Sequence, residues 1–429
     1  MNHGRPADVP APFIRAAFCL GLMGIGATVT SCDNLLEVEA PTSVLADSLA
    51  GPASVPLLVS GAVNDFACAL GAHIYVTGLV TDELLDTQLQ GAESFNYDRR
   101  TVSPTGNEYG TQPCDFYGGI YQPVSTARWA ADNALRLLDG FSDAEVLNRT
   151  ELIATAAAYS GYSHILLGEA FCTAAIDAGP ELTSAEVLAL AEAKFTRAID
   201  AATTAGRTDL LNMALIGRAR ARLDLGRGAE AAADAQLVPA GFVKNATYSA
   251  ASNRSMNRVY QMNVRDFRVS IDEPFRDLTF QGVPDPRVPV VNTGQPAPDG
   301  INTTVWITTK YASLDTPIPV ARWAEGQLII AEVMGGQTAV DIINALHAAV
   351  GLPPFSSTDP TEIANQVLEE RKRELFLEGQ HLFDTIRFDL PLIPPPGTPY
   401  GLKGGSYGDT RCLPLPNAER DNNPTLAGN

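Results

Sequence analysis

The side chains best suited to take part in a chemical reaction are two glutamates, Glu374 and Glu378, one helical turn apart. Paired carboxylates could serve as acid and base in the hydrolysis of a glycosidic bond. Arg371 falls on the same face of the predicted helix, and Arg322 and Arg387 are further candidate cations. Charges on an apolar face are costly unless they are paired. We therefore favour a structural ion network of these residues, with Arg387 as a member, over a catalytic pair.

Other catalytic patterns have little support. Residues 404–408, GGSYG, match the motif G-x-S-x-G, but they lie in a tail rich in glycine and proline. No histidine follows Ser406 to complete the order that such hydrolases use. The five histidines show no metal-binding spacing, and no phosphate-binding loop occurs. The sequence therefore predicts a protein that is not an enzyme and has no catalytic residue, metal site or cofactor.

A ligand site is predicted where aromatic and polar residues are most densely mixed, between residues 95 and 121. Sugar rings stack on aromatic side chains, while amide, carboxylate and guanidinium groups bind their hydroxyls. The alternative is that these aromatics pack the loops on which they lie. Trp129, in an apolar helical run, is expected in the core. The predicted ligand-binding residues are Phe95, Asn96, Tyr97, Tyr109, Phe116 and Tyr117.

The chain has 429 residues, 45% of them hydrophobic, and is long enough to bury a large core. Its 49 acidic and 30 basic residues give a net charge of -19. This charge repels phosphate backbones and anionic membrane surfaces, so we expect no nucleic-acid partner.

Residues 1–31 are predicted to be a signal peptide. Two arginines precede the uncharged run 16–29, whose 14 residues are too few to span a bilayer core roughly 30 Å thick. The run ends in the sequence VTSC, which resembles the bacterial lipobox and makes Cys32 the predicted lipidation site. An ordinary signal peptide is the alternative. No second apolar stretch of about 18 residues is expected, so the mature chain is predicted to be lipid-anchored rather than inserted.

Four cysteines remain after the lipidated one: Cys68, Cys114, Cys172 and Cys412. In an exported protein they can form disulfides with three possible connectivities, and the sequence does not choose between them.

Helical signals dominate the middle of the chain. Capping boxes at 142–145 and 183–186 precede segments rich in alanine and leucine. Ala191, Phe195 and Ala198 follow the small-aromatic-small spacing of tetratricopeptide repeats. The sequence thus predicts antiparallel helix pairs, with helices at 143–177, 184–204, 210–225 and 229–238.

The second half changes character at about residue 240. Residues 240–320 are predicted to form loops and short strands, because asparagine, proline and β-branched residues replace the alanines. Further helices are predicted at 319–332, 338–350 and 359–379, the last with Asp359 as N-cap and Gly379 as its stop. The proline-rich tail from 391 onward is predicted to be non-helical.

The C-terminal segment resembles a known family. Residues 370–379, ERKRELFLEG, followed by FDTIR at 383–387, are similar to the E-R-x-x-E-L-x-x-E-G and D-L-x-R signature of the SusD/RagB family. Its D-P-R, K-Y and I-P pieces have counterparts in the same order at 285–287, 310–311 and 413–414. His381 and Phe388 depart from the usual pattern.

This resemblance implies a mostly α, SusD-like fold, with tetratricopeptide-like helix pairs and a loop-rich region of short strands, over one domain at 32–429. It also implies a nutrient-uptake lipoprotein of the outer membrane that faces the outside. Such proteins capture oligosaccharides or peptides and deliver them to a SusC-like TonB-dependent transporter barrel. The rival hypothesis is a helix-repeat lipoprotein scaffold that binds protein partners, and a glycosidase is a weaker third.

Overall fold

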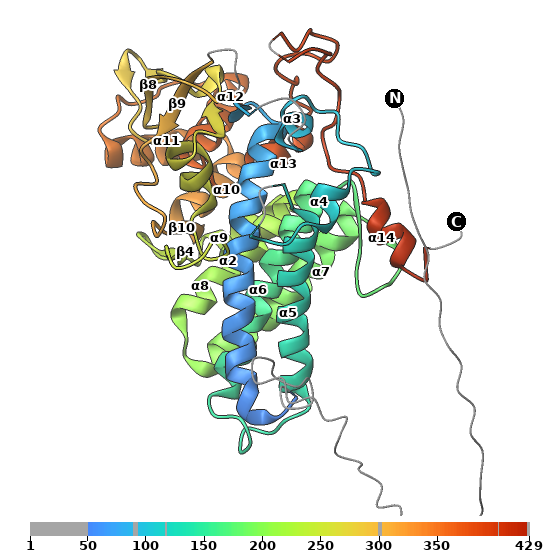
Figure 1. Ribbon diagram of the computed structural model, residues 1–429. Helices are drawn as coiled ribbons and strands as arrows, with labels where there is room; N and C mark the ends of the chain where they lie inside the picture. The colour runs from blue at the N-terminus through green and yellow to red at the C-terminus, as the bar shows by residue number, and fades with distance from the viewer. Residues whose placement is uncertain (1–49, 89–92, 116–117, 299–302, 402, 427–429) are drawn as a thin grey trace, which may run out of the picture. The chain divides into compact units, whose positions relative to one another are not determined.

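The computed structural model describes residues 50–88, 93–115, 118–298, 303–401 and 403–426. The predicted signal peptide, Cys32, Phe116 and Tyr117 lie outside these ranges. The described residues form one compact unit. The fold is mostly helical, as predicted, and the strands are short (Figure 1).

The longest helix, α2 (Val55–Val80), lies against α5 (Tyr121–Asp139) and α6 (Arg149–Ala170) in the centre of the structure (Figure 1). Every residue from 66 to 80 is buried. By length and composition alone, Pro52–Val80 is apolar enough to cross a membrane. The expectation that no such stretch follows the signal peptide was therefore wrong, and in this fold the segment is a core helix.

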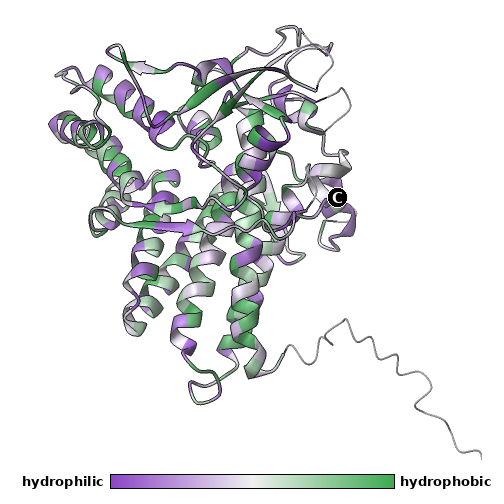
Figure 2. Cartoon of the chain, turned by 60° about the vertical axis from the view of Figure 1, so that its left-hand side comes forward, coloured by the Kyte–Doolittle hydropathy of each residue, from purple (hydrophilic) through white to green (hydrophobic). Residues whose placement is uncertain are grey.

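The predicted helix pairs are present. Helix α6 packs on α7 (Ser184–Ala205), and α8 (Thr208–Asp224) follows with α9 (Gly228–Ala235). The long helices carry bands of hydrophobic residues (Figure 2).

Phe195 fills the gap between neighbouring helices. A Cβ atom at Gly161 or Gly217 would come within 2.7 or 2.3 Å of its ring, so both positions require glycine. Ala191 and Ala198 are also buried, which confirms the spacing argument.

Two boundaries in this region differ from the prediction. The capping box at 183–186 is formed, with the Glu186 carboxylate accepting from the Thr183 backbone N–H. The similar box at 142–145 closes only a turn, and α6 begins later, at Arg149. At its other end α6 stops at Ala170, well before residue 177.

The C-terminal tail accounts for the early end of α6. Leu413 N–H donates to the Ala170 carbonyl at 2.8 Å, and Cys172 N–H donates to the Leu413 carbonyl at 2.9 Å. A disulfide joins Cys172 to Cys412, whose Cα atoms are 5.1 Å apart. Tail contacts thus replace the next helical turn.

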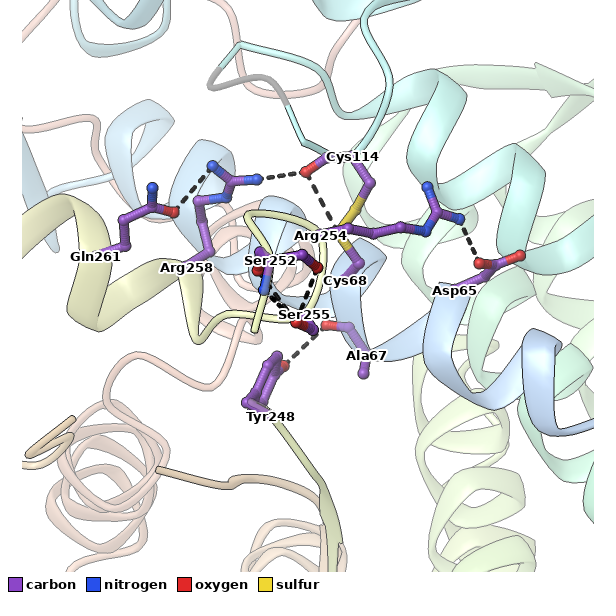
Figure 3. The surroundings of a disulfide bond; sticks show 10 residues. All are labelled: Asp65, Ala67, Cys68, Cys114, Tyr248, Ser252, Arg254, Ser255, Arg258 and Gln261. Atoms are coloured by element: carbon purple, nitrogen blue, oxygen red, sulfur yellow. Dashed lines mark hydrogen bonds and ion pairs between the residues drawn. A yellow bond between two sulfur atoms is a disulfide. The ribbon is translucent and has the colours of Figure 1, made fainter. Parts of the chain in front are cut away.

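A second disulfide joins Cys68 of α2 to Cys114, with Cα atoms 6.0 Å apart. Arg258 donates to the Cys114 carbonyl beside it (Figure 3). The hydroxyl of Tyr248 donates to the Ala67 carbonyl at 2.9 Å. The segment around residues 248–258 is therefore attached to the middle of the core helix.

The strands form five antiparallel pairs among the described residues. Strand β10 (Ile318–Arg322), which pairs with β4 (Val243–Ala246), occupies residues predicted as the start of a helix at 319, and this helix instead begins at Trp323. The pairs are β1 (Leu84–Asp86) with β5 (Val269–Ile271), β2 (Thr173–Ala175) with β3 (Glu181–Thr183), β4 (Val243–Ala246) with β10 (Ile318–Arg322), β6 (Thr279–Phe280) with β7 (Val283–Pro284), and β8 (Val290–Pro296) with β9 (Thr304–Thr308).

The C-terminal helices are α10 (Trp323–Met334), α11 (Gly336–Val350) and α12 (Pro360–Glu374). Asp359 caps α12 as predicted, accepting from the N–H groups of Thr361 and Glu362. The helix ends at Glu374, five residues before the predicted stop at Gly379.

The remaining helical elements are short. The tail is not wholly non-helical as predicted, because α14 follows Pro416. These elements are α3 (Glu93–Asp98), α4 (Asn107–Thr111), α13 (His381–Arg387), α14 (Asn417–Asn422), the 3-10 turns η1 (Pro52–Ser54) and η3 (Glu273–Phe275), and the π-helical turn η2 (Tyr260–Arg265).

Candidate functional site

Three of the predicted ligand-binding aromatics lie inside the protein. Phe95 is 5% exposed, and Tyr97 and Tyr109 are fully buried. Tyr97 donates to the Gly118 carbonyl at 2.5 Å, and Tyr109 donates to the Pro414 carbonyl at 3.3 Å. As placed, these side chains cannot stack on a ligand, and the packing alternative describes them.

The reason is that the C-terminal tail covers this segment. The ring of Tyr400 meets Phe95 edge-on at 5.3 Å, and its hydroxyl donates to Asp98 at 2.6 Å. Asn96 is half-buried, and its backbone carbonyl accepts from Thr101. Phe95 and Tyr400 are about 300 residues apart in sequence, so the composition of residues 95–121 could not predict that the C-terminal tail covers them.

A buried acid lies under the same segment. Burial raises the pKa of Asp98 from 3.8 to about 8, although Tyr400 and the Asp86 N–H donate to it. Lys403, from the tail, pairs with the neighbouring Asp86. The segment is thus joined to the tail by buried polar contacts.

Arg322 is the cation shared by the two signature glutamates. Its guanidinium contacts Glu374 at 2.5 Å and Glu378 at 2.9 Å. Lys310 reaches the other Glu378 oxygen at 2.7 Å, and Arg287 contacts Glu374 at 3.3 Å. These contacts neutralise both carboxylates.

The same part of the chain explains why α12 ends early. Arg322 donates to the Glu374 carbonyl, Lys310 to the Phe376 carbonyl, and Tyr311 to the Leu377 carbonyl. Side chains from residues 310–322 therefore take the backbone acceptors that a longer helix would have used.

Arg371 belongs to a neighbouring cluster. It pairs with Asp384 at 2.8 Å rather than with the two signature glutamates. Arg387 also contacts Asp384, at 2.9 Å, and it pairs with Glu332 of α10. The four predicted network residues therefore all lie in ion pairs, but in two clusters. The first joins Glu374 and Glu378 to Arg322 of β10, and the second connects α10, α12 and α13.

This geometry does not suit glycoside hydrolysis. A carboxylate pair for that reaction needs one group that holds a proton near neutral pH. Burial would raise the pKa of Glu378, but Arg322 and Lys310 outweigh burial and bring the pKa below its ordinary value. Both Glu378 oxygens are occupied by cations, so Glu378 is a poor general acid.

A concave site elsewhere was missed by the sequence analysis. Trp129 on α5 is 55% exposed, and the expectation that it lies in the core was wrong. It forms part of the wall of a cavity of about 670 Å³, within the roughly 300–1,000 Å³ of ligand pockets. The wall also includes Lys194 of α7, Asp177 after β2 and Glu419 of α14.

The helix spacing carried a usable signal. Trp129, Asp132, Asn133 and Arg136 follow at intervals of three and four residues, so they share one face of α5. A face of polar side chains interrupted by one tryptophan differs from a core stripe. The nearby Ala127 and Ala131 lie on the opposite, buried face, which misled the prediction.

Charged groups around the cavity hold one another in place. Arg128 contacts Asp177 at 2.6 Å, and Lys194 contacts Asp132 at 2.5 Å. Arg136 donates to the Asn133 side-chain carbonyl at 2.8 Å. Each cation thus has a defined position before any ligand arrives.

The fold is that of SusD-like proteins. A SusD homolog from Bacteroides thetaiotaomicron VPI-5482 superposes with a TM-score of 0.65 at 15% identity, over 89% of this chain and 98% of that chain. Residues 290–429, which contain Arg322, both signature glutamates and the Arg371–Asp384–Arg387 cluster, match the family model described as the SusD family. The C-terminal part of the chain therefore resembles the SusD family in sequence, and the chain has a SusD-like fold.

Two further solved structures resemble this protein. A SusD superfamily protein from Parabacteroides distasonis ATCC 8503 has a TM-score of 0.64 and 13% identity, over 89% of this chain and 98% of that chain. A SusD-like carbohydrate binding protein from Bacteroides vulgatus ATCC 8482 has a TM-score of 0.57 and 17% identity, over 81% and 86%. A comparison with curated proteins finds no match.

Proposed function

We propose that this protein is a nutrient-binding lipoprotein that captures an oligosaccharide or peptide and delivers it to a SusC-like TonB-dependent transporter. The observation that carries the proposal is the combination of a SusD family sequence at 290–429 with a SusD-like fold over most of the chain. A related structure is described as a carbohydrate binding protein, which favours a sugar as the cargo.

The proposed location is the outer face of the outer membrane. The lipobox-like sequence before Cys32 would supply the anchor once residues 1–31 are removed, and several acyl chains on one cysteine give stable attachment. Residues 32–429 then act as one SusD/RagB-like domain outside the bilayer.

The protein is proposed to bind without catalysis. Glu374 and Glu378 are held by Arg322 as a structural support for the C-terminal segment. The cargo therefore leaves unchanged, and transport through the barrel is the next step.

Two measurements test this function. Thermal shift of the purified protein is first recorded against a panel of oligosaccharides and peptides, where binding to the native state raises Tm. Co-purification with an outer-membrane barrel from the native host is then examined. A ligand-dependent rise in Tm and a co-purifying barrel are expected. Protein partners without any small-molecule shift would instead support the scaffold hypothesis.

A further inference from the structure

We propose that the cavity beside Trp129 and a neighbouring cavity over α14 form one groove that binds a neutral oligosaccharide of more than one ring. This inference rests on the proposed capture function, and it assigns a site and a ligand class to it.

The first step is the exposure of Trp129. Only two aromatic side chains are exposed among the described residues, Trp129 at 55% and Phe388 at 38%. Arg387 lies over the Phe388 ring at 4.5 Å, whereas Trp129 forms part of the wall of the larger cavity. An exposed indole in a concave wall is a suitable platform for the apolar face of a sugar ring.

The second step is the charge of the wall. Three cations line the first cavity, Arg128, Arg136 and Lys194, and three carboxylates balance them. The local formal charge is therefore zero in a chain whose net charge is -19. A wall of this kind offers no net attraction to an anionic or a cationic ligand, and it presents donors and acceptors together. Neutral sugar hydroxyls both donate and accept, so they match it.

The third step is the continuation of the groove. A second cavity of about 240 Å³ is lined by residues of α4, α5 and α14, and α4 contacts both of the other helices. Both cavities have Ser125 and Glu419 in their walls. The second cavity also presents the amide side chains of Gln122 and Asn422, and both residues are exposed. Two cavities with shared walls make a site longer than one ring.

The fourth step is the alignment along α5. Gln122, Ser125, Trp129 and Arg136 follow at intervals of three, four and seven residues, so they form one stripe on the helix. From 122 to 136 this stripe extends for roughly 21 Å at 1.5 Å per residue. A linear stripe with one aromatic platform suits a linear sugar chain.

The experiment is calorimetric titration of the full chain. Neutral oligosaccharides of one to six units are compared with acidic oligosaccharides of equal length and with short peptides. We expect the affinity for neutral ligands to rise with chain length until both cavities are filled. Trp129→Ala should lower this affinity by at least about tenfold, because aromatic anchors dominate binding energies.

Matched variants separate the parts of the proposal. Phe388→Ala removes the other exposed aromatic and should leave affinity unchanged. Gln122→Ala with Asn422→Ala should weaken long ligands and leave a single sugar unit unaffected. Thermal unfolding of every variant confirms that it is folded.

The contrary results are distinct. If the wild-type protein binds a sugar and Trp129→Ala binds it equally well, the groove is wrong while the capture function stands. A preference for acidic sugars or peptides overturns the ligand class, and affinity independent of chain length overturns the joined groove. No binding of any ligand by the wild-type protein refutes the capture function itself.

Discussion

Arg322 is expected to be the most important single side chain for the stability of the C-terminal segment. The replacement Arg322→Met leaves Glu374 and Glu378, whose side chains are 12% and 4% exposed, without their shared cation. Removing one partner of a buried ion pair costs about 3–5 kcal/mol. Lys310 and Arg287 still contact one glutamate each, so we expect a loss near the lower end, about 3 kcal/mol.

The assay is urea unfolding at pH 7 followed by circular dichroism. Arg197→Met is the matched control, because Arg197 pairs with Asp139 at an exposed site where the side chains are 36% and 53% exposed. Exposed pairs contribute less than about 1 kcal/mol. An equal loss in the two variants would refute the structural role of Arg322.

The pH dependence gives a second check. In the wild-type protein the pKa of Glu378 is lowered, so its contribution to stability is present at neutral pH and is lost as pH falls through the folded-state pKa. Without Arg322 the folded-state pKa rises, and protonation relieves the uncompensated charge. The free-energy difference between Arg322→Met and wild type should therefore shrink as pH falls below about 4.5.

Three further outcomes follow from the same structure. Replacing Cys172 and Cys412 by serine opens a loop whose ends are 240 residues apart, and chain entropy predicts that the free energy of unfolding falls by about 5 kcal/mol. A fall below about 1 kcal/mol in urea unfolding would show that this disulfide does not stabilise the attachment of the tail. The raised pKa of Asp98, about 8, means that its contribution to stability is full below pH 3.8 and is lost as pH rises toward 8. Asp98→Asn should therefore gain in Tm relative to wild type between pH 5 and pH 8, and a constant difference would argue against a buried acid. Gly217→Ala should destabilise the helix pairs by about 1–3 kcal/mol, because the new Cβ overlaps the Phe195 ring; recovery in a double variant with Phe195→Leu would identify the overlap as the cause.

Local signals predicted the parts of the fold that local interactions determine. The capping box at 183–186 and the Asp359 cap were correct, because caps involve residues within one turn. The predicted end of α12 was wrong, because side chains from residues 310–322 donate to the backbone carbonyls at that end of the helix. A pattern confined to one helix carries no information about such distant donors.

The candidate site shows the same division. Residues 95–121 are rich in aromatic and polar side chains, as the sequence shows. The tail that covers this segment comes from residues 400–415, which are distant in sequence. Trp129 was assigned to the core from its alanine neighbours, although its own face of α5 carries Asp132, Asn133 and Arg136. Reading the helix face rather than the adjacent residues would have found the site.

The most direct test is a crystal structure of the full chain with a neutral oligosaccharide bound. The account predicts density for a sugar ring stacked on Trp129, with hydroxyls near Asn133, Asp177 and Glu419 and the chain continuing toward Asn422. A ligand bound elsewhere, with the cavity beside Trp129 left empty, would contradict it.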